Sequence, residues 1–530
     1  MSGQGAYQPV GSPASPPSSR YATYLRRSRP YVILLVAFGL VLFLFVPGDA
    51  YTALLTTSLS LEDEPTVAIV DTAQLVRLMA KAGRDCGWYH GQPHRERTKA
   101  PYGWPVETPT DSPYVLTEAD QYSLDHILAT RFKSYPNQVP LLSSTTRPDF
   151  VFVPVLSQLW SNPWGCPDPN LHQGIADTTR LLRRLVQEVG PTSYPRIVLA
   201  LSPIRSQLER DVFTPELMKE FRDSVVVVSI ENALKTNPEG MKYTIDLPYP
   251  TGFHLSQNRS NPRAVLDDSL LERERPYLVN YAASTTHPWG APALERFNGF
   301  ALRAALHKEF STFNSRRPAS STSSRILYDE ITNAMDGAQN LTLFHEHMTE
   351  STFCPMPAGD SPTRRAFFEA VLLGCIPVVF RQHAYGRLLP SSPEINDVSK
   401  YTVFVPENDL IFERRPTLIE RLESIPVERV KEMQRHLHQI APKLQWSIPD
   451  EEEWFPLDPW DDTAETIMPE GAKMFNLTET REKGDWPTRD AFSMVLKELR
   501  FIRDGKWKLG KVEDLRPDPL EEQEGERESN

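Results

Sequence analysis

The sequence predicts an α/β protein with two doubly wound domains that face a cleft, preceded by a single N-terminal transmembrane helix. Short apolar runs alternate with helical spacing in two separate parts of the chain, a polar interval divides these parts, and one long uncharged run lies near the start. Alternating strands and helices favour a layered fold with parallel strands. The chain of 530 residues is long enough for two domains of ordinary size.

The uncharged run, Tyr31 to Val46, predicts a transmembrane signal anchor within residues 31–47. As a helix it would span roughly 24 Å at about 1.5 Å per residue, which suits the thinner membranes of the early secretory pathway. Arginines precede the run and Asp49 follows it. The positive-inside rule then assigns residues 1–30 to the cytosol and the rest of the chain to a lumen. A cleaved signal peptide is the alternative, which the long preceding tail and a poor cleavage site disfavour.

After a stem at residues 48–64, residues 65–262 predict the first α/β domain. Its expected strands are Val67 to Val70, Phe150 to Pro154, Arg196 to Leu201 and Val225 to Ile230. Its expected helices are Gln74 to Ala82, Asp177 to Val189 and Pro215 to Arg222. Each strand candidate is a short apolar run, which is typical of strands that are buried on both faces.

A polar interval, Ser256 to Glu274, separates this domain from a second one at residues 275–505. The second domain begins with a strand candidate at residues 277–279 and repeats the alternation. Residues 506–530 are rich in glutamate and aspartate, which predicts a disordered, solvated tail.

The most informative stretch is residues 351–380, STFCPMPAGDSPTRRAFFEAVLLGCIPVVF. Gly359 would let the backbone bend closely around a ligand. Asp360 or Ser361 is expected to cap a helix, with Pro362 at its first position. Gly374 is expected to end this helix before a short buried strand.

Arg364 and Arg365 place two permanent charges at the start of this helix, where free N–H groups and the helix dipole favour phosphate. Glu369 lies one turn after Arg365 and could accept hydrogen bonds from ribose hydroxyls while the arginines bind a diphosphate. The alternative is an exposed ion pair between Arg365 and Glu369 on a helix whose apolar residues belong to the core.

The motif residues together resemble the signature of the exostosin-type glycosyltransferases, family 47, in particular the branch of plant xyloglucan galactosyltransferases. The residues that carry this resemblance are Gly359-Asp360-Ser361, Thr363-Arg364-Arg365, Phe368-Glu369 and Gly374 to Val378. Weaker similarity is found at Asp149 to Val155, Asp246 to Pro250, Arg275 to Ala282 and Tyr401 to Glu407. That branch usually has Asp at the position of Glu369, and it has a histidine after Ala384-Tyr385 that this chain lacks.

The resemblance implies the two-domain GT-B architecture and an inverting transfer of a hexosyl or pentosyl group. The donor would be a UDP-sugar, with galactose the leading expectation, and the acceptor a polysaccharide or glycan. The implied nucleotide-sugar-binding residues are Gly359, Asp360, Ser361, Thr363, Arg364, Arg365 and Glu369. With the predicted anchor, this makes the chain a single-pass type II protein of the Golgi membrane with a lumenal catalytic region.

A base from the first domain would deprotonate the acceptor hydroxyl. The sequence offers Asp149, His254 and His287 as weak candidates, and a structural role is favoured for each. No Asp-x-Asp pair occurs in the chain, so we expect no metal ion and no cofactor, with the arginines neutralising the leaving diphosphate. The net charge of −12 disfavours a nucleic-acid partner.

Two other functions remain open from the sequence. The chain could be a catalytically silent subunit in a complex with another glycosyltransferase, or a glycan-binding protein that takes no nucleotide. An intact set of Arg364, Arg365 and Glu369 favours the transferase, because a charged pocket is costly to keep without a ligand.

Features of lumenal proteins accompany the motif. Acceptor triplets for N-glycosylation begin at Asn258, Asn340 and Asn476. Cys354 and Cys375 flank the motif and could be buried thiols or form a bridge, and Cys86 and Cys166 could pair in an oxidising compartment.

Overall fold

The structure is a computed structural model, and by its internal contacts one compact unit runs from Pro65 to Asn530. The residues that it describes are 64–72, 104–105, 114–118, 123–133, 135–141, 147–155, 169–189, 192–201, 219–230, 242–255, 274–283, 299–316, 325–330, 341–359, 363–382, 384–385, 388–447 and 490–508.

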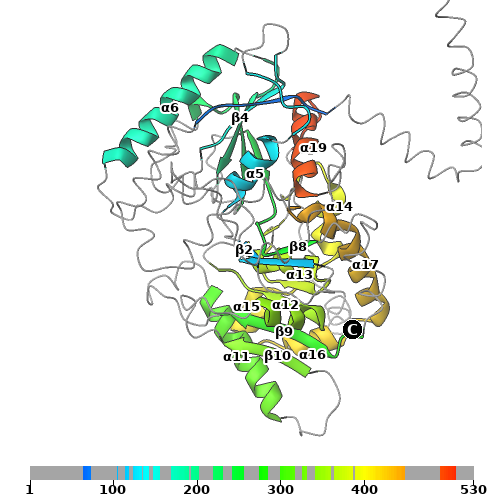
Figure 1. Cartoon of the computed structure of the whole chain (residues 1–530). Helices are drawn as coiled ribbons and strands as arrows, with labels where there is room; N and C mark the ends of the chain where they lie inside the picture. Colours follow the sequence, from blue (N-terminus) through cyan, green and yellow to red (C-terminus); the bar gives the residue numbers. More distant parts are fainter. Residues whose placement is uncertain are drawn as a thin grey trace, which may run out of the picture. The chain divides into compact units, whose positions relative to one another are not determined.

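The first half of this unit contains a five-stranded parallel sheet (Figure 1). Its strands are β1 (Val67–Ile69), β4 (Phe150–Val153), β5 (Ile197–Leu201), β6 (Val225–Ser229) and β7 (Tyr243–Asp246). Residues of β4, β5 and β6 are buried along their whole length, which explains their continuous apolar sequences. Four of these strands confirm predictions from the sequence, and β7 was not predicted.

Two helices of this half are α5 (Leu124–Lys133) and α6 (Pro169–Val189). The predicted helix at Asp177 to Val189 is confirmed and begins eight residues earlier than predicted. The predicted helix at Gln74 to Ala82 lies outside the described residues, as does the first half of the one at Pro215 to Arg222. The exposed side chains of α6 form ion pairs, among them Arg183 with Glu220 and Arg184 with Glu188.

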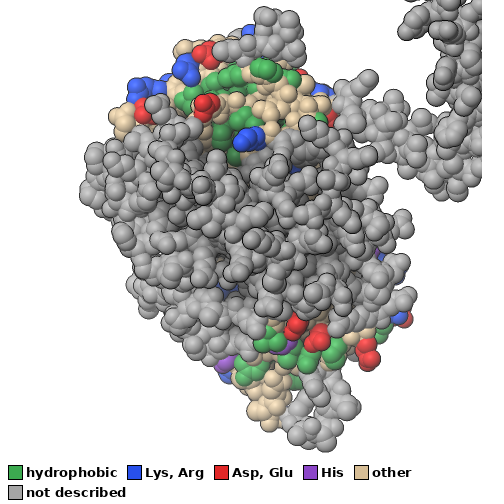
Figure 2. Space-filling view, viewed as in Figure 1, with side chains coloured by type: hydrophobic (Ala, Val, Ile, Leu, Met, Phe, Trp, Pro, Cys, Tyr) green, Lys and Arg blue, Asp and Glu red, His purple; other side chains and the backbone are tan. Residues whose placement is uncertain are grey.

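Basic and acidic side chains are mixed over the α6 region on the face shown in Figure 2. Arg183 and Glu220, with N and O atoms 2.8 Å apart, are about half exposed. Exposed pairs of this kind contribute little to stability. The mixed charge is nevertheless unlike the basic stripe of a nucleic-acid-binding helix.

The second half contains another five-stranded parallel sheet, in the order β10-β9-β11-β12-β13. Its strands are β9 (Tyr277–Ala283), β10 (Arg325–Glu330), β11 (Ser351–Met356), β12 (Ile376–Val379) and β13 (Val403–Phe404). The order reverses at β9, because β10 pairs on one side of it and β11 on the other. This reversal makes the second sheet doubly wound, as predicted.

The first sheet differs from the prediction in this respect. Its described strands run β1-β4-β5-β6-β7 in one direction, so they contain no reversal. A doubly wound sheet needs one, since right-handed crossovers place helices on both faces only when the winding direction changes. Within the described strands, the doubly wound prediction therefore holds for the second sheet alone.

Helices lie between and after the strands of the second sheet along the chain. They are α11 (Gly299–Arg316), α12 (Leu341–Thr349), α13 (Arg365–Leu372), α14 (Pro393–Asn396), the 3-10 helix η3 (Val398–Lys400), α15 (Glu407–Ile411), α16 (Leu418–Glu423) and α17 (Val427–Leu444). α11 packs on α15 and β10, and α13 packs on α17 and β12. The reversal at β9, with right-handed crossovers, puts α11 on one face and both α12 and α13 on the other.

The last described helix, α19 (Ala491–Arg503), follows the second half in sequence but contacts the first half. Its Phe492 ring lies 5.0 Å from that of Phe132 in α5. Arg131 of α5 pairs with Asp490 at 2.8 Å, and both side chains are buried. The sequence placed this helix in the second domain, at residues 275–505, because no local pattern records a return to the first sheet.

A small antiparallel sheet completes the described strands: β2 (Trp104–Pro105), β3 (Tyr114–Glu118) and β8 (Phe253–Leu255). The sequence analysis did not predict it.

Several predictions fall on parts of the chain outside the described residues. These are the cytosolic tail at 1–30, the anchor at 31–47, the stem before Glu64, the tail after residue 508, the glycosylation triplets at Asn258, Asn340 and Asn476, and the pair Cys86 and Cys166. Among the helices that the structure does describe, none has the length and apolar character required to cross a bilayer.

Candidate functional site

The motif loop leaves the second sheet at the point where its strand order reverses. β11 ends at Met356, residues 357–359 follow, and α13 begins at Arg365. Asp360, Ser361 and Pro362 lie outside the described residues. In open α/β sheets, ligands bind beyond the carboxyl ends of the strands at such a reversal. The predicted nucleotide-binding loop therefore lies where this fold places a ligand.

The motif helix starts later than the sequence predicted. Arg364 is the N-cap of α13, with extended backbone angles of φ −143° and ψ 145°, and no side chain caps the helix. The expectation of a cap at Asp360 or Ser361, with Pro362 at the first helical position, is wrong. The backbone N–H of Arg364 donates instead to the Tyr385 hydroxyl at 3.1 Å, which holds this residue in an extended conformation.

Tyr385 is itself fixed by its neighbours. Its ring stacks on Phe367 of α13, with centroids 3.6 Å apart. Burial raises the pKa of the Tyr385 hydroxyl, which therefore stays neutral. Arg364 Nη1 donates to the Pro357 carbonyl at 3.2 Å, so part of this guanidinium stabilises the motif loop.

Arg365 and Glu369 form an ion pair within α13, with Arg365 Nε 2.7 Å from Glu369 Oε1. The two side chains are 19% and 5% exposed. The alternative of an exposed surface pair is therefore wrong, because the carboxylate lies inside the protein. His345 of α12 is fully buried and places its Nε2 3.7 Å from the same carboxylate oxygen.

These two neighbours keep Glu369 ionised. Burial by itself would raise its pKa, but the charge of Arg365 and the contact with His345 outweigh this effect and lower the pKa to about 2. Within the described residues, the hydrogen bond and the ion-pair contacts of the carboxylate all fall on Oε1. Among the described residues Oε2 has no partner, so it can accept hydrogen bonds from a ligand.

Gly359 lies against a side chain from another helix. Arg303 of α11 is buried and donates from Nη2 to the Ala358 carbonyl at 3.0 Å. A Cβ atom at Gly359 would come within 3.3 Å of the same nitrogen. The glycine thus allows Arg303 to approach the motif loop closely.

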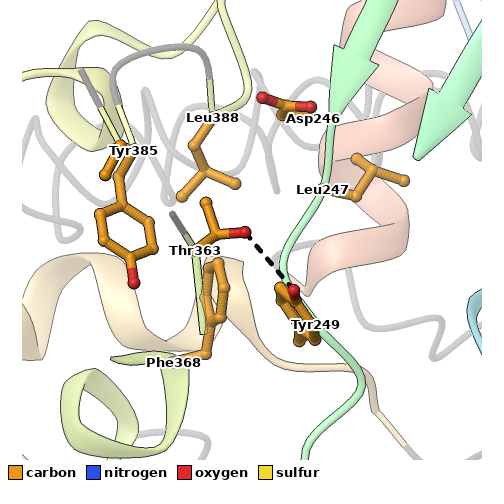
Figure 3. Close-up of a pocket in the computed structure, with 8 residues that line it drawn as sticks. Asp246, Leu247, Tyr249, Thr363, Phe368, Tyr385 and Leu388 are labelled. Carbon is orange, nitrogen blue, oxygen red and sulfur yellow. Dashed lines mark hydrogen bonds between the residues drawn. The ribbon is translucent and has the colours of Figure 1, made fainter. Parts of the chain in front are cut away.

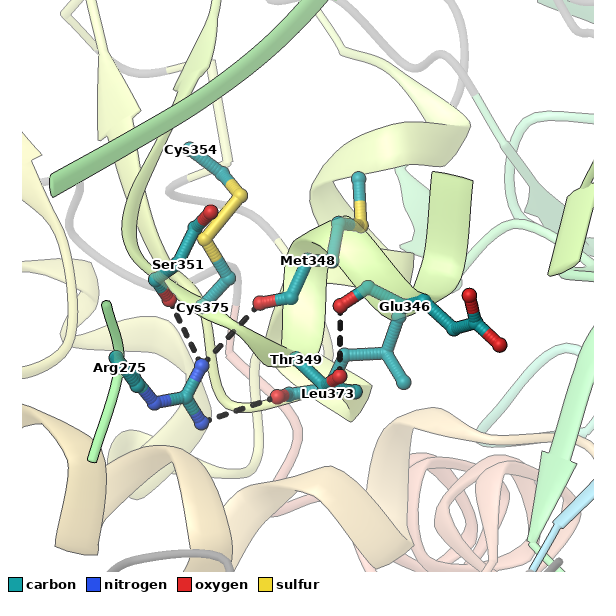
Figure 4. The surroundings of a disulfide bond; sticks show 8 residues. All are labelled: Arg275, Glu346, Met348, Thr349, Ser351, Cys354, Leu373 and Cys375. Carbon is teal, nitrogen blue, oxygen red and sulfur yellow. Dashed lines mark hydrogen bonds between the residues drawn. A yellow bond between two sulfur atoms is a disulfide. The ribbon is translucent and has the colours of Figure 1, made fainter. Parts of the chain in front are cut away.

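Figure 4 shows the region behind the motif, where Cys354 and Cys375 form a disulfide. This confirms the bridge as the correct alternative to two buried thiols. Cys354 lies in β11 and Cys375 directly precedes β12, so the bridge closes the segment that contains the whole motif. Arg275 donates to the Met348 carbonyl of α12 at 3.2 Å and to the Leu373 carbonyl after α13 at 3.3 Å.

Gly374 ends α13 as predicted. It has a φ of +71°, and a Cβ atom there would lie 2.7 Å from Arg275 Nη2. Glycine is favoured at this position because it adopts the left-handed conformation and leaves room for the arginine.

A small pocket lies between the end of β7 and the motif (Figure 3). It encloses about 250 Å³ of space that includes open solvent. Asp246, Leu247 and Tyr249 line it from the first half, and Thr363, Phe368 and Tyr385 from the second. The hydroxyls of Tyr249 and Thr363 lie 3.4 Å apart, and the Leu389 N–H donates to the Asp246 carbonyl at 3.1 Å. The two halves therefore meet beside the motif.

The candidate bases have different positions. Asp149 directly precedes β4, at the amino ends of the strands, and its Oδ2 accepts from the Thr66 N–H at 2.9 Å and lies 3.5 Å from Arg503 Nη1. This edge is opposite to the one where ligands bind, which favours a structural role for Asp149. His254 lies in β8 and its side chain is outside the described residues, as is all of His287.

Sequence reasoning missed four residues that support the motif: His345, Arg275, Arg303 and Tyr385. Each lies outside the motif, and the contact that each makes with it is not local in sequence. One weak signal existed for His345, since it stands three residues before buried Met348 on the apolar face of a short helix. Within the described ranges no group of three or more His, Cys, Asp or Glu side chains forms a metal site, and metal independence stays a prediction.

Comparisons with known proteins identify relatives in Arabidopsis thaliana. A probable xyloglucan galactosyltransferase, GT15, is 30% identical over 230 residues, which cover 43% of this chain and 42% of the relative. The xyloglucan galactosyltransferase MUR3 is 26% identical over 270 residues, 51% of this chain and 38% of the relative. The xyloglucan-specific galacturonosyltransferase 1 is 28% identical over 203 residues, 38% of this chain and 27% of the relative.

The chain thus spans about two fifths of the length of the first two of these relatives. A solved structure, UGT89C1 of Arabidopsis thaliana with quercetin, covers 70% of this chain and 93% of its own at 13% identity, but its TM-score of 0.24 is too low to carry an argument. The model of the exostosin GT47 domain matches residues 108–422, more than half of the sequence. This chain belongs to the exostosin GT47 family.

Proposed function

We propose that this protein is a glycosyltransferase that moves a sugar from a UDP-sugar to a polysaccharide or glycan acceptor. Family membership supports the reaction class, and the named relatives that are xyloglucan galactosyltransferases support galactose as the first donor to test. The relative that is a galacturonosyltransferase makes UDP-galacturonic acid the second.

One observation carries the nucleotide site. Glu369 is buried, ionised and bound through one oxygen only, in the middle of the helix that follows β11, a strand beside the point where the sheet order reverses. A buried carboxylate is costly unless it has partners or a function. Oε2 would accept hydrogen bonds from the ribose, in keeping with the acceptor-only chemistry of a carboxylate.

The diphosphate would bind at the start of α13. Arg365 is the first residue of α13 and contacts Glu369 through Nε, so its guanidinium places a permanent positive charge at the helix start that attracts phosphate. The helix dipole favours the same charge. The charge that develops on the leaving diphosphate would be stabilised by Arg365 and by those Arg364 nitrogens that do not bind Pro357.

The transfer would invert the anomeric centre and need no metal ion. A base of the first half takes the proton of the acceptor hydroxyl, the oxygen attacks the anomeric carbon, and the bond to the diphosphate breaks, which releases UDP. We also propose a GT-B arrangement of the two halves and a single-pass type II orientation in the Golgi membrane. Protease treatment of intact microsomes should then remove only about the first thirty residues.

Titration and turnover test the proposal together. The purified full-length chain should bind UDP more tightly than GDP or CMP, and it should transfer galactose from UDP-galactose to xyloglucan oligosaccharides. Activity after exhaustive chelation should stay within a small factor of the untreated value. UDP binding without any transfer, across a panel of donors, would indicate a silent subunit, and no UDP binding would contradict the nucleotide site.

A further inference from the structure

His345 contacts the candidate ribose-binding carboxylate from outside the motif. Its side chain is fully buried, and its Nε2 lies 3.7 Å from Glu369 Oε1. Arg365 approaches that same oxygen at 2.7 Å. Glu369 Oε1 is therefore held between a guanidinium and an imidazole, whereas Oε2 has no hydrogen bond or ion pair within the described part of the chain.

The two side chains that contact Glu369 Oε1 differ in how strongly they restrict its position. Arg365 belongs to the same helix as Glu369, stands in the less favourable order for a pair four residues apart, and is partly exposed. A long, flexible arginine side chain can follow a bound phosphate. His345 comes from α12, is enclosed on all sides and has only two rotatable side-chain bonds, so it gives a fixed reference for the carboxylate.

The side chain of Arg275 joins the ends of the two helices. Arg275 donates to the Met348 carbonyl in α12 and to the Leu373 carbonyl at the end of α13 (Figure 4). His345 precedes Met348 by three residues and Glu369 precedes Leu373 by four, so each side chain lies about one helical turn from this shared contact. The separation of His345 and Glu369 is thus set by two helices joined at their ends.

We propose that His345 is a positioning residue that fixes Glu369 Oε1 and thereby turns Oε2 toward the ribose of the donor. The inference rests on the proposed function, since it needs a nucleotide at α13. Without His345 the carboxyl group can rotate and give both oxygens to Arg365. The ribose would then lose its acceptor, and the arginine would be drawn away from the diphosphate.

The test compares UDP with 2′-deoxy-UDP by calorimetric titration of the full-length protein. If Glu369 accepts from the ribose, the wild type should prefer UDP by about tenfold or more, as expected for a hydrogen bond to a charged group. His345→Leu should reduce this preference to about threefold or less. A merely structural role would weaken the binding of both nucleotides alike and leave their ratio unchanged.

Three further variants keep the test decisive if His345→Leu folds poorly. Gln can place its amide nitrogen near the position of Nε2, so His345→Gln should retain the preference, whereas His345→Asn is too short and should lose it. His347→Leu, on the same helix but partly exposed, should bind as the wild type does.

Equal UDP preferences in His345→Asn and His345→Gln would overturn the inference. A wild type that binds UDP and 2′-deoxy-UDP equally well would overturn the role of Glu369, and with it that of His345. A wild type that binds no UDP would overturn the proposed nucleotide site as a whole.

Discussion

At the first sheet Asp149 precedes β4 and contacts Arg503 of α19, whereas at the second sheet Glu369 lies within α13 and contacts Arg365 and His345. Both carboxylates are paired with arginine. The first lies at the amino edge of a sheet wound in one direction, and the second lies within the helix that follows β11, in a sheet whose strand order reverses. Similar pairs thus stabilise the fold at one sheet and form part of the proposed binding site at the other.

The largest expected effect belongs to the second sheet, which contains the disulfide. Replacing both Cys354 and Cys375 with Ala should lower the free energy of unfolding by roughly 3 kcal/mol, since the bridge closes a loop with a sequence separation of 21. Urea unfolding of the two proteins measures this loss. Reduction of the wild type should give a similar value, and unchanged unfolding would show that the bridge does not hold the motif segment.

Arg365→Ala should weaken UDP binding by about ten- to a hundredfold, or roughly 1.5–3 kcal/mol, the range of a charge-assisted hydrogen bond. Glu369→Gln should also weaken it, because an amide oxygen accepts less strongly than a carboxylate. Asp149→Asn is the matched control at the first sheet and should lower stability while UDP affinity stays within about twofold of wild type. Equal UDP affinity in all three variants and the wild type would contradict the contrast between the sheets.

Two glycines allow the stability cost of a left-handed backbone to be measured apart from the cost of a steric clash. Gly374 and Gly505 both have positive φ, at +71° and +67°, but only Gly374 lies close to another group. Gly505→Ala should cost about 1 kcal/mol of stability for the left-handed backbone. Gly374→Ala should cost about 1–2 kcal/mol more, since its Cβ would displace Arg275. Equal losses in urea unfolding would show that the Arg275 contact is dispensable.

The pH dependence of stability should have opposite signs at two buried glutamates. Arg365 and His345 outweigh burial and lower the pKa of Glu369 from 4.5 to about 2, so its contribution is present above about pH 4.5 and is lost as the pH falls toward 2. Burial raises the pKa of Glu498, despite hydrogen bonds from Ser391 and Trp507. Its ionisation therefore lowers stability as the pH rises above about 4.5.

Comparison of Glu369→Gln and Glu498→Gln with the wild type between pH 6 and 3 should reveal these opposite slopes in the free energy of unfolding. As the pH falls, the free energy of unfolding of the wild type should approach that of Glu369→Gln. Relative to Glu498→Gln, the free energy of unfolding of the wild type should rise. If the free energy of unfolding depends on pH in the same way in both variants, neither environment shifts the pKa of its carboxyl group as described.

The sequence by itself determined the strands at Phe150, Ile197 and Val225, the end of the motif helix at Gly374 and the family. These features are local: a continuous apolar run buries itself as a strand, a left-handed helix end needs glycine, and a motif keeps its residues at fixed spacing. The family also followed from the residues around Arg365 and Glu369.

Only the tertiary structure decided what these residues touch. The start of α13 depends on Tyr385, the burial of Glu369 depends on His345, and α19 returns to the first sheet through Phe492. None of these contacts leaves a periodic signal, because each joins side chains from elements that are separate in sequence. Winding direction is also set by strand pairing across the whole sheet, so the reversal that creates the binding edge became visible only once β10, β9 and β11 were placed side by side.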